Sequence, residues 1–357
     1  MESLRMIIRG LGIALGAVAI VTALLPMIHT GIWWIRVMDF PRLQFACIAF
    51  AALLFMIVTW SPGSLWQGIV IAGIAAVLVH QIWWIVPFTP LGKEQVQSAQ
   101  RPDDPRVRLS VMVANVLQTN RDASAVLQQI RDHEPDVVVL LEIDAWWAEQ
   151  LEQLSGFPHR LIRSQEDTYG MAVFSQLPIS DAVVRNLVEE HIPSMHMNIE
   201  LRDGTQVRFA GLHPAPPWPG LADDSRDRDA ELVIVGRMMA DAGPAVVAGD
   251  LNDVAWSHTS NLFQEVSDLL DPRRGRGMYN SFHAKWFFLR WPLDHVMHSA
   301  DFRLISMQRL DHIGSDHFPV LIRLSYEPDG VVQQETPASD AEAEQEASEI
   351  IQESDDG

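Results

Sequence analysis

The chain has 357 residues and a formal net charge of −20, yet its first 90 residues carry only six charged side chains. Residues 89–326 contain 22 basic and 33 acidic side chains, and the residues from 327 onward add 11 acids with no Lys or Arg. A protein that binds DNA mainly through backbone phosphates usually has a basic footprint, which these totals do not show. The single cysteine, Cys47, excludes a disulfide framework and a cysteine-based metal site.

The N-terminal 90 residues contain three apolar stretches of nearly bilayer length, with tryptophans at their ends. They run from about Leu11 to Ile28, Leu43 to Trp60 and Trp66 to Phe88. Basic residues before the first stretch also imitate a signal peptide, but two further apolar stretches favour a membrane anchor. We therefore predict three transmembrane helices over residues 1–90, which would put the N-terminus and the rest of the chain on opposite sides of the bilayer.

A polar segment with two prolines, residues 91–106, is typical of a linker, and strand and helix patterns then alternate through residues 107–326. Many strands with a few interposed helices predict an α/β sandwich of two sheets. Residues 327–357 are acidic and, from Glu335, lack aromatic side chains, which predicts a disordered tail or, alternatively, a frayed acidic helix. Strands are expected at about 107–116, 136–143, 171–175, 195–201, 207–213, 245–250, 293–298 and 318–324, and helices at 122–133 and 226–240.

Several predicted strands end in, or begin just after, an acid, an amide or a histidine. Asp and Asn are common turn residues, so any one of these positions alone is weak. Six of them in chain order predict a single cluster at one rim of the sheets. The residues are Asn115, Glu142, His213, Asp250 with Asn252, Asp294, and Asp316 with His317.

The motifs that carry these residues resemble those of the endonuclease/exonuclease/phosphatase, or DNase I-like, superfamily, in its membrane-anchored bacterial type. The resemblance covers about residues 107–325 and is most specific in the pairing of Gly-Asp-Leu-Asn at Asp250 with Ser-Asp-His at His317. It implies a four-layer α/β sandwich, in which two packed mixed β-sheets are flanked by helices. It also implies Mg²⁺ or Mn²⁺ rather than zinc.

Phosphoester chemistry requires a hard cation and a base, and the motif residues supply candidates for both. Glu142 is expected to bind the metal, with Asn115 as a neutral ligand and Asp316 as a direct or water-mediated one. His317 is the expected general base because imidazole titrates near neutral pH, and Asp294 is the partner that the resemblance implies.

The remaining site residues are expected to handle water and substrate. Asp250 would hold the attacking water, Asn252 would contact a phosphate oxygen, and His213 would donate to the phosphate or the leaving group. Tyr169 either reaches the phosphate or packs in the core. Phe287, Phe288 and Trp291 form either an apolar lip beside the membrane or part of the core.

We predict a membrane-anchored, metal-dependent phosphoesterase whose partners are the lipid bilayer and a phosphoester substrate, preferably a lipid phosphate or phospholipid headgroup. A DNase-like nuclease is one alternative, and a non-catalytic membrane scaffold is another; no obligate protein partner is evident. Arg5 and Arg9 favour a cytoplasmic N-terminus, whereas Arg36 and Arg42 oppose it. The resemblance to membrane-anchored bacterial members favours an extracytoplasmic catalytic domain in a multi-pass cell-membrane protein.

Overall fold

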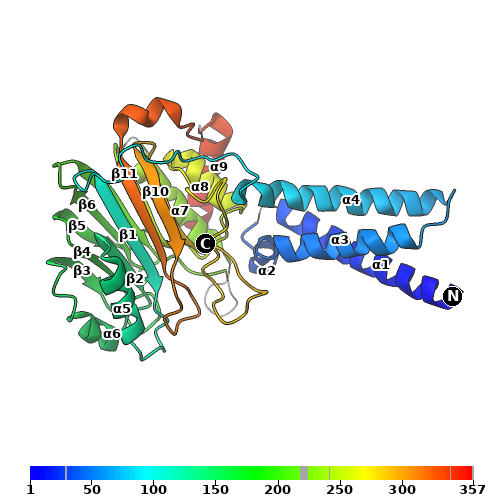
Figure 1. Cartoon of the computed structure of the whole chain (residues 1–357), viewed down its shortest axis with the longest axis horizontal. Helices are drawn as coiled ribbons and strands as arrows, with labels where there is room; N and C mark the ends of the chain where they lie inside the picture. The colour runs from blue at the N-terminus through cyan, green and yellow to red at the C-terminus, as the bar shows by residue number, and fades with distance from the viewer. Residues whose placement is uncertain (29, 218–223, 241, 338, 356–357) are drawn as a thin grey trace.

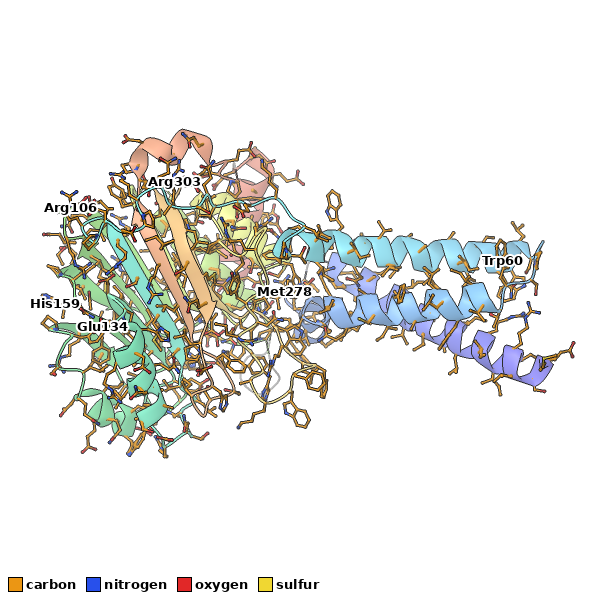
Figure 2. The ribbon with its side chains drawn as sticks, viewed as in Figure 1. Trp60, Arg106, Glu134, His159, Met278 and Arg303 are labelled. Carbon is orange, nitrogen blue, oxygen red and sulfur yellow. The ribbon has the colours of Figure 1, made fainter. Side chains whose placement is uncertain are left out.

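The computed structural model describes residues 1–357 except 29, 218–223, 241, 338 and 356–357. Three long helices form an arm that projects from a domain built of two sheets, and the N-terminus lies at the far tip of the arm (Figure 1). Trp60 lies near that tip, whereas Met278 lies where the arm meets the domain (Figure 2). The chain therefore runs along the arm three times before it enters the sheets.

The arm consists of α1, α3 and α4; residues 25–41, which include three short helical segments, join α1 to α3, and residues 59–64 join α3 to α4. Two long helices of the described chain, Glu2–Met27 and Leu65–Phe88, are long and apolar enough to cross a membrane. A helix pair, Trp33–Asp39 with Arg42–Val58, also passes this test but is bent by 72° at its break. By length and composition, then, the chain offers two spans, or three if the bent pair is one span. The bounds are α1 Glu2–Leu24, η1 Leu25–Met27, α2 Trp33–Arg36, η2 Val37–Asp39, α3 Arg42–Val58, α4 Leu65–Ile85 and η3 Val86–Phe88.

Small residues let the three arm helices approach closely. A Cβ added to Gly16 would lie 2.6 Å from Ile74, and one added to Gly12 would lie 3.1 Å from Phe55. The spacing of these glycines is the small-xxx-small pattern with which membrane helices pack, because lipid tails supply no hydrophobic force between helices. Ala19, Ala49 and Ala52 complete the buried seam.

The first sheet contains six strands in the order β10-β11-β1-β2-β4-β3, and the second contains five in the order β5-β6-β7-β8-β9. Within each sheet one pair is parallel, β1 with β2 and β7 with β8, while the other pairs are antiparallel. The first-sheet strands are β1 Arg108–Asn115, β2 Val137–Leu141, β3 His159–Arg163, β4 Met171–Ser175, β10 Phe302–Arg309 and β11 Val320–Tyr326. The second-sheet strands are β5 Ile179–Arg185, β6 Ser194–Glu200, β7 Gln206–Leu212, β8 Ala245–Asp250 and β9 Asp294–His298.

Alternating apolar side chains of the two sheets meet in one core, and helices cover both outer faces. The inter-sheet core includes Val111, Val139, Phe209 and Val246. Helices α5 and α6 pack on the first sheet, and α7 and α8 pack on the second. The four-layer α/β sandwich predicted from the sequence is thereby confirmed. These helices span α5 Ser124–His133, α6 Ala145–Leu151, α7 Arg226–Met239 and α8 His258–Ser267.

Two segments differ from their sequence-based expectation. The acidic tail contains a helix, α9 (Ala341–Asp355), whose Ala347 is fully buried against α7 and α8. Apolar residues recur at helical spacing within the acidic sequence, and the narrow apolar face that they form packs on the domain. The expected linker is also held in place, because Val96 is buried and residues 97–99 pair with Leu304 of β10.

Candidate active site

The topology of the two sheets explains why residues far apart in the sequence meet at one rim. Because β1 and β2 run parallel, Asn115 at the end of β1 lies beside the end of β2, and Glu142 follows directly. The parallel pair β7 and β8 places His213 and Asp250 together in the same way. Strands β9 and β11 run the opposite way and so begin at this rim, where Asp294 pairs with Asp250.

Glu142 sits in a left-handed backbone position just beyond β2 and is held by two hydrogen bonds. Its Oε1 accepts from Asn115 Nδ2 at 2.8 Å, and its Oε2 accepts from the backbone N–H of Gln118 at 3.0 Å. Burial raises the pKa of Glu142 and the nearby Asp316 adds to the rise, whereas these two hydrogen bonds and His317 oppose it. The carboxylate is therefore positioned, but its negative charge is not paired with Lys or Arg.

Asn115 links the two carboxylates of this rim. Its Nδ2 donates to Glu142 and, at 3.3 Å, to Asp250 Oδ2, while its Oδ1 accepts from the backbone N–H of Leu117 at 3.0 Å. In this arrangement the amide nitrogen, and not the oxygen expected to bind a metal, faces the carboxylates. Asn115 thus fixes the spacing between Glu142 and Asp250.

His317 is oriented by Asp294, as the sequence predicts for a base and its partner. His317 Nδ1 and Asp294 Oδ2 are 2.7 Å apart, so the imidazole presents Nε2 to Asp250 Oδ2, which lies at 3.5 Å. Burial opposes the charged imidazole, but Asp294 and Asp250 outweigh it and raise the pKa of His317 to about 10. The ring also packs against Phe282, whose centroid is 4.9 Å away.

Asp250 lies between the base and the phosphate-side candidates. Its Oδ1 accepts from the backbone N–H of Asn252 at 3.0 Å, and its Oδ2 lies 4.0 Å from His213 Nε2. Burial raises the pKa of Asp250 to about 6, with Asp294 adding to the rise and His317 opposing it. Burial lowers the pKa of His213, which favours a neutral imidazole that donates from one nitrogen.

The two remaining substrate-side candidates border this group. Asn252 adopts a left-handed backbone conformation, and its Nδ2 donates to the Pro214 carbonyl at 2.9 Å, which ties the ends of β7 and β8 together. The Tyr169 ring is tilted against His213, with centroids 5.8 Å apart. Burial raises the pKa of Tyr169 to about 12, so its hydroxyl remains a donor.

The donor set fits a divalent cation. Asp250, Asp294 and His317 offer ligand atoms that all lie within 4.8 Å of one another, and Asp294 Oδ1 is buried without a hydrogen-bond partner. Glu142 and Asp316 add two carboxylates, against which His317 supplies the only positive group in this cluster. Uncompensated carboxylate oxygens are the ligands that Mg²⁺ and Mn²⁺ prefer.

The sequence did not identify the residues that hold the site residues in position through hydrogen bonds. The backbone N–H of Asp294 donates to Ser281 Oγ at 3.1 Å, and Arg228 Nη1 donates to the Asn252 carbonyl at 2.9 Å. His295 faces away from the cluster, with Nε2 2.9 Å from the Asp253 carbonyl, and burial lowers its pKa to about 3. No local motif marks these residues, because each is defined by what it touches across the fold.

The sequence left it open whether the aromatic residues near the site are exposed or packed in the core, and the structure shows both cases. Trp291 packs with Phe40 in a buried cluster. Phe287 and Phe288, by contrast, are 78% and 50% exposed, and Trp286 is 53% exposed. We call residues 286–289 the aromatic loop. Its base is joined to the catalytic rim, since Ala284 N–H donates to the Asp316 carbonyl at 2.6 Å.

Comparison with solved structures identifies the same fold. An endonuclease/exonuclease/phosphatase from Beutenbergia cavernae has a TM-score of 0.51 and 22% identity, over 62% of this chain and 72% of that one. A family protein from Bacteroides thetaiotaomicron has a TM-score of 0.50 and 19% identity, over 62% and 98%. Humanized TDP2 of D. rerio has a TM-score of 0.50 and 14% identity, over 61% and 99%. At these identities the likeness shows the fold alone.

The sequence itself shows the family. No curated protein matches the chain. The profile of the Endonuclease/Exonuclease/phosphatase family, however, matches residues 112–317, which include every residue of the rim from Asn115 to His317. The chain therefore belongs to the endonuclease/exonuclease/phosphatase family, whose members are metal-dependent phosphoester hydrolases.

Proposed function

We propose that this protein hydrolyses a phosphoester of a membrane phospholipid or lipid phosphate in the bilayer that holds its own helical arm. The observation that carries the lipid assignment is the aromatic loop. It joins the catalytic rim through Ala284 and the arm through Gln44 of α3, whose Nε2 donates to the Phe288 carbonyl at 2.7 Å. Exposed aromatic side chains that continue the apolar surface of a membrane helix favour insertion among lipids.

The proposed mechanism assigns one task to each rim residue. Glu142, with Asp316 and Asp250, would hold Mg²⁺ or Mn²⁺. A divalent cation there would offset the charge of the phosphoester and of the carboxylates, and would favour the neutral imidazole. His317 Nε2 then accepts a proton from a water that Asp250 orients, while Asp294 keeps Nδ1 protonated.

The substrate side of the rim would bind the phosphate. His213 and Asn252 donate hydrogen bonds to its oxygens, and the Tyr169 hydroxyl adds a third donor. His213 lies near Asp250, and Tyr169 packs on His213, so these donors border the water site.

We further propose that the catalytic domain faces the extracytoplasmic side. Arg5 and Arg9 lie at the far tip of the arm, where they donate to the Trp60 and Thr59 carbonyls. Arg36 and Arg42, which oppose this orientation in a count of basic residues, are buried in ion pairs with Asp229 and Asp39. Because the charge count is divided, the proposal rests on the resemblance to membrane-anchored bacterial members and on the usual dominance of the first span.

Orientation is tested with reporter fusions to the C-terminus of the full chain. Alkaline phosphatase should be active there and green fluorescent protein dark, while green fluorescent protein at the N-terminus should fluoresce. The reverse pattern would put the catalytic domain in the cytoplasm and favour the nuclease alternative.

The lipid assignment is tested by weakening the aromatic loop. Phe287→Ser with Phe288→Ser should slow hydrolysis of phospholipid vesicles by about 10-fold or more, because two apolar side chains no longer enter the bilayer. Hydrolysis of soluble bis(p-nitrophenyl) phosphate should be unchanged. Ile162→Ser with Val183→Ser, which alters two exposed apolar residues of β3 and β5, is the matched control. Equal loss on both substrates, or faster cleavage of DNA than of lipid, would refute the assignment.

A further inference from the structure

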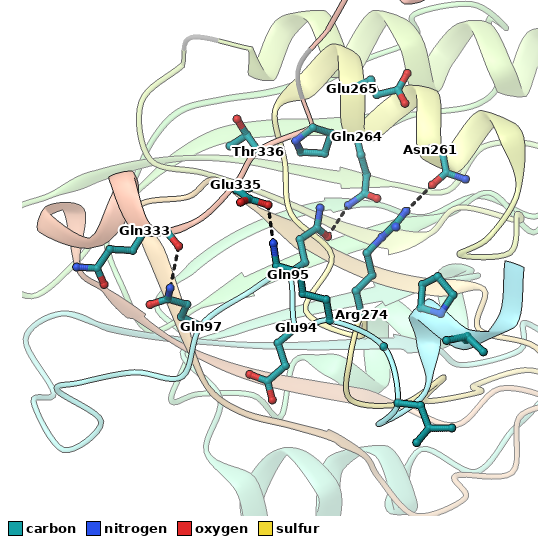
Figure 3. A pocket seen from close by; sticks show the side chains of 16 residues that line it. Glu94, Gln95, Gln97, Asn261, Gln264, Glu265, Arg274, Gln333, Glu335 and Thr336 are labelled. Atoms are coloured by element: carbon teal, nitrogen blue, oxygen red, sulfur yellow. Dashed lines mark hydrogen bonds and ion pairs between the residues drawn. The ribbon is translucent and has the colours of Figure 1, made fainter. Parts of the chain in front are cut away.

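A cavity of about 700 Å³ lies away from the catalytic rim and shares none of the rim residues. Its walls come from the segment that follows α4, from α8 and from the residues that lead into α9 (Figure 3). It opens where a candidate membrane span, Leu65–Phe88, ends, beside the highly exposed Leu91. This position corresponds to the headgroup region of a bilayer that contains the arm.

Arg274 is the unusual residue of this cavity. Its guanidinium donates to Asn261 Oδ1 and lies 5.2 Å from the centre of the Phe88 ring, while its Nε is buried without a partner. Among the described residues it forms no ion pair. Burial lowers the pKa of Arg274, and Asp271 and Glu265 oppose this fall without forming an ion pair with it. A largely buried cation without a direct ion pair is costly, which makes it a candidate for an anionic ligand.

The other charges of the cavity are mostly neutralised within the protein. Lys93 pairs with Glu335 at 2.7 Å, and Glu94 pairs with Arg276 at 2.7 Å. Glu265 is the one lining carboxylate that has no ion pair in the described part of the chain. Arg274 and Glu265 are therefore the two lining charges without an ion pair in the described part of the chain, and Arg274 is the one that can bind an anion.

We propose that this cavity binds the phosphodiester of a phospholipid headgroup, with Arg274 as the binding cation. The planar guanidinium matches phosphate oxygens in a way that a point charge does not. Side-chain amides stand beside it: Gln95 lies next to Gln264, and both flank Arg274 in Figure 3. The bound lipid would be a structural ligand of the junction between arm and domain, distinct from the substrate.

The test is the melting temperature of the full chain in detergent, in the Glu142→Gln background so that added lipid survives. Short-chain phosphatidylglycerol should raise it by about 3 °C, as expected for a ligand supplied well above its dissociation constant. Diacylglycerol with the same chains, which lacks the phosphate, should not. Deacylated glycerophosphoglycerol separates a soluble phosphodiester from a lipid, and an equal rise with it would overturn the lipid assignment.

Two variants make the result specific. Arg274→Met should abolish the rise, while Arg131→Met, at an exposed arginine of α5, should preserve it. Asn261→Asp gives Arg274 an internal carboxylate, so it should raise the melting temperature without lipid and remove the response to lipid. If Arg274→Met does not fold, Asn261→Asp still decides the matter. A full response to phosphatidylglycerol in the Asn261→Asp protein would overturn the proposal.

Discussion

Two buried charge clusters adjoin the loop that follows β8. In one cluster the positive and negative charges balance, and in the other they do not. The junction cluster contains Arg36, Arg228, Asp229 and Asp253, with two charges of each sign. Asp229 contacts both arginines, at 3.2 Å for Arg36 and 2.7 Å for Arg228. Ser257 Oγ adds a hydrogen bond to Asp253 at 2.7 Å. Each carboxylate of this cluster is thus neutralised.

The catalytic cluster contains several carboxylates and two imidazoles, of which burial favours the neutral form of His213. Asp229 and Asp250 are both buried, yet their pKa values shift in opposite directions. At Asp229, burial is outweighed by Arg228 and Arg36, which lower the pKa, whereas burial raises the pKa of Asp250 to about 6. The difference teaches that balanced charge stabilises the fold, while unbalanced charge marks the position where a ligand must supply the missing charge.

The largest expected effect comes from the unbalanced cluster. Glu142→Gln should lower turnover by about 10³-fold or more, because it replaces the anionic side chain that we propose holds the metal with a neutral side chain of almost equal volume. The melting temperature should stay the same or rise, since carboxylate repulsion decreases. Glu149→Gln, at an exposed residue of α6, is the control. Near-normal turnover in Glu142→Gln would show that the metal ligands are assigned wrongly.

Substitution of the proposed general base, His317, should cause a slightly smaller loss of turnover. His317→Ala should lower turnover by about 10²-fold or more, the usual scale of general-base catalysis. Asp294→Asn should also be damaging, and the double variant should be little worse than His317→Ala, because the two residues act as a unit. A double-mutant cycle of turnover measures this, with His159→Ala on the edge strand β3 as a control. Strictly additive losses would contradict the pairing.

Substitutions in the junction cluster should lower the stability of the protein. Arg36→Met leaves two buried carboxylates with one arginine, so it should destabilise the protein by about 3–5 kcal/mol. Removing residues 1–90 should have a similar or larger effect, since Phe88 also packs on Trp256, and Trp256 Nε1 donates to the Asp39 carbonyl. Denaturant titration of each variant checks this, with Arg226→Met at the surface as the control. An unchanged midpoint for Arg36→Met would mean that the junction cluster contributes no stability.

The smallest effect is expected at α9. Ala347→Glu forces a charge into the contact with α7 and α8 and should release the helix, at a cost of about 1–3 kcal/mol. Ala341→Glu, at an exposed position of the same helix, should be nearly neutral. Hydrogen exchange of residues 341–355 reports release directly. Equal exchange in both variants and the wild-type protein would instead support the disordered tail.

The sequence predicted the parts of the fold that have strong periodicity and the parts of the site that have fixed motifs. Buried strands such as β4 and β8 were found with their observed bounds. All the motif residues from Asn115 to His317 lie at one rim, because parallel strands end, and antiparallel strands begin, at the same edge.

The rest depended on tertiary contacts that no local pattern contains. Edge strands β3 and β5 are mostly exposed, so they lack an apolar signal. The pairing of Arg36 with Asp229 spans 193 positions in the chain, and a count of charges along the sequence gives no sign of it. The orientation of the Asn115 amide, likewise, follows from Glu142, Asp250 and Leu117 together.

The most direct test of the central claim is hydrolysis of phospholipid vesicles by the full chain as Mg²⁺ or Mn²⁺ is added to protein treated with chelator. The account predicts that phosphoester cleavage appears with the cation, saturates, and is absent in Glu142→Gln at every cation concentration. Cleavage that proceeds equally well without a divalent cation, or that Glu142→Gln retains, would contradict it.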